Sequence, residues 1–132
     1  MERKHSILYA ALILITGIWV LHFIAGLFYL YWTYWWYDVL MHFLAGVTGG
    51  LASYWVLFHS GNLFNKPQKP LFCILSVLLC VLIAGVAWEI FEYVNGLTDS
   101  AEGYKLDTFN DLILDSAGAV LAAMIASRQR HD

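Results

Sequence analysis

The sequence predicts an all-α protein, an integral membrane four-helix bundle that forms a single domain over residues 1–132. The chain is 61% hydrophobic and 17% aromatic, and only 13% of its residues are charged, whereas about a quarter are charged in a soluble domain. It holds four apolar stretches of about 20 residues, the length that crosses a bilayer. Its basic residues fall almost entirely at the two ends and in one loop.

The first span is expected at residues 7–32. It follows the basic start MERKHS, and His22 is the only acidic or basic residue between positions 6 and 37. A cleaved signal peptide has a shorter apolar run and a small-residue cleavage site. The sequence therefore predicts a retained signal-anchor span.

Three further spans are expected at residues 38–59, 71–94 and 107–127. The third follows NKPQKP, in which two prolines indicate a loop. The fourth is the least regular because Asp111 and Asp115 interrupt it. An amphipathic helix on the membrane surface is therefore an alternative for this last stretch.

Small residues recur four positions apart in two of these spans. Gly46 and Gly50 form one pair, and Gly118 and Ala122 form the other. Such pairs let helix backbones approach closely in a membrane. We interpret them as packing positions of a compact bundle, not as a site.

The basic residues also predict the topology. Six of the seven fall at the N-terminus, in the loop after the second span and at the C-terminus, and four spans put these three segments on one side. The positive-inside rule then predicts a multi-pass membrane protein with both termini in the cytoplasm. The aromatic run YLYWTYWWY would lie at the outer interface. The six residues are Arg3, Lys4, Lys66, Lys69, Arg128 and Arg130.

Acidic and histidine side chains within the spans share helix faces and depth. Neighbours in each group are three or four residues apart, so each group lies on one face. At about 1.5 Å per residue, the acidic groups of three spans fall in the same outer half of the bilayer. The set comprises Asp38, His42, Glu89, Glu92, Asp107, Asp111 and Asp115, and the first span could add His22.

These carboxylates cannot all be ionised and unpaired, because each charge in hydrocarbon costs several kcal/mol. No lysine or arginine lies within the spans to neutralise them. The acids are therefore either partly protonated or bound to cations. Carboxylates and imidazoles on facing helices build divalent metal sites in bundles, and this set suits Mg, Mn, Ca, Fe or Zn. The predicted ligands are His22, Asp38, His42, Glu89, Glu92, Asp111 and Asp115.

Other roles are open for several of these residues. Asp38 and Asp107 each begin an expected helix and could be N-caps. Thr108 and Asp111 resemble a capping box, provided that the fourth helix starts later. His22 could be a lone hydrogen-bonded histidine. For the remaining acids, the alternative is a water-filled cavity with protonated carboxyl groups.

The combined pattern resembles a bacterial inner-membrane family that includes the YjdF proteins. The resemblance covers the last three spans, and no reaction comes with it. YjdF-like proteins are longer, so it implies that this chain works with a partner copy. The matching positions are Asp38-x-x-x-His42-Phe43-x-x-Gly46, Glu89-x-x-Glu92 and Asp107-Thr108-x-x-Asp111-x-x-x-Asp115-x-x-Gly118-Ala119.

A looser similarity is to the VanZ-like membrane proteins, which are linked with teicoplanin resistance. That family has Lys, Gln and Asn where this chain has Val39, Glu92 and Asp115. These departures make the cluster more acidic. They favour metal binding and argue against a resistance role.

The expected function is a metal-dependent hydrolase or transferase that acts on a lipid or a lipid-linked phosphate at the periplasmic leaflet. Glu92 or Asp107 would be the general base, and the metal would act as a Lewis acid or activate water. The alternatives are a structural metal site in an envelope protein, a cation or proton pathway, and a haem held by His22 and His42. The expected partners are membrane lipids and further copies of the chain, as a dimer or larger. The net charge of −3 gives no reason to expect nucleic acid.

Overall fold

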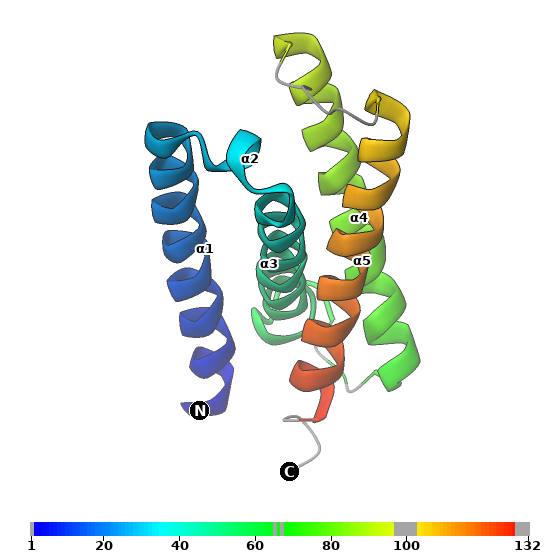
Figure 1. Ribbon diagram of the computed structural model, residues 1–132. Coiled ribbons are helices and arrows are strands. Elements are labelled where there is room, and N and C mark those ends of the chain that lie inside the picture. Colours follow the sequence, from blue (N-terminus) through cyan, green and yellow to red (C-terminus); the bar gives the residue numbers. More distant parts are fainter. Residues whose placement is uncertain (1, 65, 67, 97–102, 129–132) are drawn as a thin grey trace.

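The computed structural model describes residues 2–64, 66, 68–96 and 103–128, and these residues form helices and short connections without a strand (Figure 1). Four of the helices are long and apolar enough to cross a membrane, which confirms the predicted fold class. The elements are α1 (Glu2–Phe28), α2 (Leu30–Thr33), α3 (Trp35–Tyr54), the π-helical turn η1 (Trp55–His59), α4 (Pro70–Asn95) and α5 (Tyr104–Arg128).

Two helices begin earlier than the sequence suggested. α3 starts at Trp35, and the residue before it, Tyr34, makes no capping hydrogen bond with its side chain. Asp38 and Asp107 therefore lie inside the first turns of α3 and α5. The N-cap alternative is wrong for both, because the three residues before each of them are already helical. A carboxylate in the first turn still interacts favourably with the helix dipole.

The first expected span is divided in the structure. α1 ends at Phe28, and Tyr29 takes a left-handed conformation with φ of 55° before the short helix α2 begins. A positive φ is uncommon for a residue other than glycine. It reverses the chain here, so that α2 leads directly into α3.

Helix α5 packs between α3 and α4, whereas α3 contacts all three other long helices and has α1 on its outer side (Figure 1). Four alanines of α5 have no exposed surface: Ala119, Ala122, Ala123 and Ala126. The alternative of an amphipathic surface helix for this stretch is therefore wrong.

The closest helix contact is where α3 crosses α5. A Cβ atom added to Gly118 would lie 2.6 Å from the backbone nitrogen of Val47, and one added to Gly46 would overlap the backbone of Asp115. A Cβ on Gly50 would lie 2.8 Å from the Cβ of Ala122. The small residues thus pack as predicted, backbone against backbone.

Below this crossing, toward the ends of α3 and α5, the core is apolar. Tyr54, Cys73 and Val77 are fully buried there, together with the α5 alanines. At the other end, α1 is attached to α3 through buried Ala25 and through the Tyr37 hydroxyl, which donates a hydrogen bond of 2.9 Å to the Leu21 carbonyl. The start of α1 and the end of α5 lie at the same end of the bundle (Figure 1).

Candidate functional site

The imidazole of His42 lies at the centre of the predicted polar cluster. Its Nε2 atom is 3.8 Å from Asp38 Oδ1 and 3.6 Å from Asp111 Oδ2. Its Nδ1 atom is 3.5 Å from Asp115 Oδ1. Carboxylates from α3 and α5 therefore face both edges of one histidine ring.

The helix crossing explains this arrangement. Asp38 and His42 are one turn apart on α3, and Asp111 and Asp115 are one turn apart on α5. Gly46 is one turn beyond His42 and contacts the backbone of Asp115. The two polar pairs are thus set at the same level because the backbones meet directly beside them.

Burial makes the negative charges of this cluster energetically costly. Asp111 and Asp115 are only 4% and 7% exposed, whereas 39% of the Asp38 side chain is exposed. Asp115 Oδ1 is buried without a hydrogen-bond partner, and its distance of 3.5 Å from His42 Nδ1 is longer than an ordinary hydrogen bond. An unsatisfied buried acceptor costs about 1–3 kcal/mol.

Helix α4 adds Glu89 to the cluster. Glu89 is 4% exposed and accepts a hydrogen bond of 2.7 Å from the Thr108 hydroxyl of α5. The capping-box alternative for Thr108 is therefore wrong, because α5 begins four residues earlier and the hydroxyl bonds across to α4 instead.

Gly85 is a member of the site that the sequence reasoning missed. A Cβ atom at this position of α4 would lie 3.0 Å from Asp115 Oδ2 and 2.9 Å from Leu112 Cδ2. The absence of a side chain makes room for the Asp115 carboxylate. Its position one turn before Glu89, on the same helix face, was a signal that could have revealed it.

Glu92 and Asp107 lie at the rim of the cluster, and both are partly exposed. The charges of Glu89, His42 and Asp38 act on Glu92, and that of Asp107 acts on Asp111. Both are thus near the site, and their role as general base stays a prediction.

His22 has a different environment. It is exposed, and its Nδ1 atom is 2.9 Å from the hydroxyl of Tyr31 on α2. Burial raises the pKa of Tyr31, and the nearby charges of Asp38 and Glu92 raise it further. Tyr31, which was interpreted only as part of an aromatic belt, thus connects α1 with the edge of the cluster, while ligation by His22 stays a prediction.

Three residues have the geometry of a possible metal site. Asp38, His42 and Asp111 each offer one ligand atom, and these atoms all lie within 4.8 Å of one another. Ligands about 2.0–2.2 Å from a tetrahedral metal are roughly 3.3–3.6 Å apart. The two nitrogen–oxygen separations of 3.6 and 3.8 Å are close to this range, and the two carboxylate oxygens lie within 4.8 Å of each other. Two carboxylate oxygens and an imidazole nitrogen therefore fit a divalent ion.

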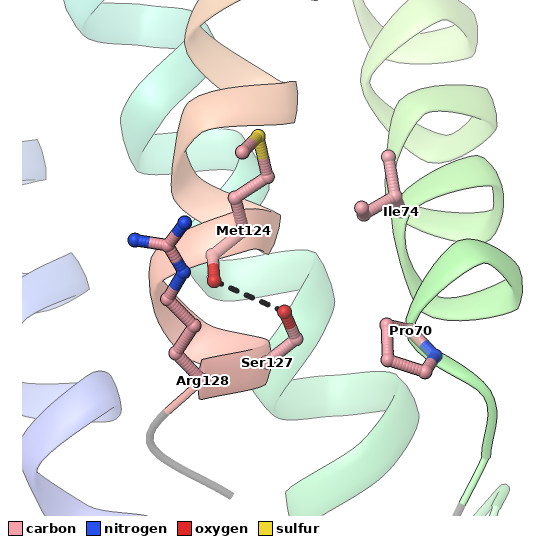
Figure 2. Close-up of a pocket in the computed structure, with 5 residues that line it drawn as sticks. All are labelled: Pro70, Ile74, Met124, Ser127 and Arg128. Atoms are coloured by element: carbon pink, nitrogen blue, oxygen red, sulfur yellow. Dashed lines mark hydrogen bonds between the residues drawn. The ribbon is translucent and has the colours of Figure 1, made fainter. Parts of the chain in front are cut away.

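A separate hollow lies at the other end of α4 and α5, and it contains none of the predicted site residues. Pro70, Ile74, Met124, Ser127 and Arg128 line it. The Ser127 hydroxyl donates to the Met124 carbonyl of its own helix, and the Arg128 guanidinium points away from α4 (Figure 2). This hollow offers no polar group to a ligand comparable with those around His42.

Comparison with known proteins identifies the family. The whole chain, residues 1–132, matches the family described as predicted membrane protein (DUF2238). No curated protein and no solved structure matches the chain. The match over the whole length agrees with the four apolar helices. The chain therefore belongs to this family of predicted membrane proteins.

Proposed function

We propose that this protein holds a divalent metal ion inside the outer half of the bilayer, with Asp38, His42 and Asp111 as ligands. The observation that carries this proposal is that His42 Nε2 faces carboxylate oxygens from two helices, with three ligand atoms within 4.8 Å. Glu89 and Glu92 are candidates for further ligands. Oxygen donors with one nitrogen favour Mg, Mn, Fe or Zn.

Charge balance supports a cation at this place. A protonated His42 would contribute one positive charge, against the carboxylates of Asp38, Asp111 and Asp115 around it. Buried charges without compensation are strongly destabilising. A divalent ion removes this imbalance, and protonation of the acids is the competing solution.

The proposed reaction is metal-dependent hydrolysis or group transfer on a lipid or a lipid-linked phosphate. The metal would supply Lewis acidity and activation of water. Three protein ligands would leave a coordination position for water or substrate, as in catalytic zinc sites, and the Asp38 side chain is 39% exposed. Glu92 and Asp107 at the same rim would act as general base.

The site is proposed to face the periplasmic leaflet of a bacterial inner membrane, and the distribution of basic residues supports this orientation. The matched family is compatible with the resemblance to YjdF-like proteins. The similarity to VanZ-like proteins supports only a location in the cell envelope.

A structural metal site is the second candidate, because the ion would join α3 to α5 whether or not it reacts. A cation or proton pathway is less favoured, since the described core below the helix crossing is apolar and offers no continuous polar relay. Haem is also less favoured. The Nδ1 atom of His22 faces Tyr31, and both nitrogens of His42 face carboxylates.

Metal content tests the proposal directly. Protein purified in detergent should carry near-stoichiometric divalent metal, measured by elemental mass spectrometry. His42→Ala and Asp111→Ala should lose it, because each removes a buried ligand. His5→Ala, which removes an exposed histidine of α1, is the matched control. Metal retained by both site variants would contradict the ligand assignment.

Activity separates the catalytic role from the structural one. Metal-loaded protein is incubated with mixed lipid extracts. A product that forms with the wild type but not with Asp111→Ala would support hydrolysis or transfer. A metal that raises the unfolding temperature without any product would favour a structural ion. Cation flux into liposomes would favour a pathway.

Cross-linking in membranes tests the expected dimer or larger assembly.

A further inference from the structure

We propose that Asp115 is not a metal ligand but a positioning residue that holds the Nδ1 hydrogen of His42 and leaves Nε2 free for the metal. The inference rests on the proposed function and deepens it. It divides the carboxylates around His42 into ligands and an orienting group. The sequence predicted Asp115 as a ligand, and its place in the bundle assigns it another role.

The carboxylates occupy opposite edges of the ring. Asp38 and Asp111 face Nε2 at 3.8 and 3.6 Å, whereas Asp115 faces Nδ1 at 3.5 Å. In a neutral imidazole, one nitrogen carries the hydrogen and the other has the lone pair. A histidine that binds a metal almost always donates its other N–H group to a carboxylate, a carbonyl or water, which fixes the tautomer and the ring orientation. Asp115 stands where that acceptor is needed.

Three helices fix Asp115 in this place. Its backbone contacts Gly46 of α3 at the crossing, and its Oδ2 atom faces Gly85 of α4, where a Cβ would be 3.0 Å away. Its Oδ1 atom is buried, has no hydrogen-bond partner and lies on the side of His42 Nδ1. The backbone contact at the crossing and the position of Oδ2 against Gly85 keep the carboxylate on the Nδ1 side of the ring.

A cobalt titration tests this role. Metal-free protein is titrated with Co²⁺, and the visible absorption bands report affinity and coordination geometry. Asp115→Asn should still bind Co²⁺, with about 10–100-fold lower affinity and with shifted bands, because the ring is no longer held. Asp115→Glu should recover part of both. Ser116→Ala is the control, since this neighbouring hydroxyl bonds only to the Leu112 carbonyl of its own helix.

Two results would overturn the inference. If Asp115→Asn lost Co²⁺ as completely as His42→Ala, Asp115 would be a ligand. If it matched the wild type in affinity and spectrum, Asp115 would have no part in orienting the ring. Asp115→Asn that binds weakly with shifted bands supports the assignment.

A second measurement keeps this inference separate from the proposed function. If the wild type bound no Co²⁺, the metal proposal would fail, and nitrogen NMR of histidine-labelled, metal-free protein would decide the role of Asp115. His42, identified by the signal missing in His42→Gln, should carry its hydrogen on Nδ1 and become a mixture of tautomers in Asp115→Asn. An unchanged tautomer in that variant would overturn the inference.

Discussion

The two halves of α5 use opposite means of packing. Residues 118–127 present small side chains, and Ala119 and Ala122 contact the backbone of α3 so closely that Gly50 could not accept a methyl group without a shift. Residues 107–115 instead place carboxylates and a threonine hydroxyl between the helices. The contrast indicates that the apolar half stabilises the bundle, while the polar half holds groups that are costly to bury.

This comparison has a physical basis. Between helices in a membrane, close backbone contact gives favourable van der Waals packing, whereas burying a carboxylate is unfavourable until a partner compensates it. The polar half can therefore persist only because the crossing at Gly46 and Gly118 holds α3 and α5 together. Substitutions in the apolar half and in the polar half can therefore measure the contribution of backbone packing and that of the buried polar groups separately.

The largest effect is expected at the crossing itself. Gly118→Leu would force a side chain into the backbone of α3 near Val47, and we expect a loss of about 3 kcal/mol or more in the free energy of unfolding, at the upper end of overpacking effects. Unfolding in mixed SDS micelles measures it. Gly17→Leu on α1 is the control, because a Cβ there meets nothing within 4 Å. Equal stability of the two variants would contradict the assigned crossing.

An intermediate effect is expected in the polar half. Thr108→Val removes the 2.7 Å hydrogen bond to Glu89 while keeping the shape of the side chain. Without this bond a buried carboxyl oxygen of Glu89 loses its donor, and such a loss costs about 1–3 kcal/mol, so stability should fall by an amount in this range. The same unfolding assay measures the change, and Thr108→Ser should stay close to the wild type. A Val variant as stable as the Ser variant would show that Glu89 does not depend on this bond.

The smallest effect is expected where α1 is attached. Tyr37→Phe removes one hydrogen bond, from the Tyr37 hydroxyl to the Leu21 carbonyl, and should cost about 0.5–1.5 kcal/mol. The loss should increase proteolysis or hydrogen exchange of α1 more than of α5, because α1 is the least buried of the four long helices. Tyr34→Phe, at an exposed position, should change neither. Equal protection of α1 in both variants would rule out this role for Tyr37.

Much of the site could be predicted from helix periodicity. Asp38 with His42, and Asp111 with Asp115, were placed on shared faces by their spacing of four, and three helices bring their acids to one end of the bundle. Gly85 and Tyr31 were missed because their contribution depends on neighbours distant in sequence. A glycine makes room only for a specific side chain on another helix, here Asp115. The bond from Thr108 to Glu89 was missed for the same reason.

The sequence by itself determined the helical class, the four apolar helices and the faces on which the acids lie, because these follow from composition and from the local 3.6-residue repeat. Only the tertiary structure decided that α5 packs between α3 and α4, that Asp38 and Asp107 lie inside helices, and which nitrogen of His42 faces which carboxylate. Those features depend on how closely two backbones approach and at what level they cross. That geometry is set by contacts between residues far apart along the chain.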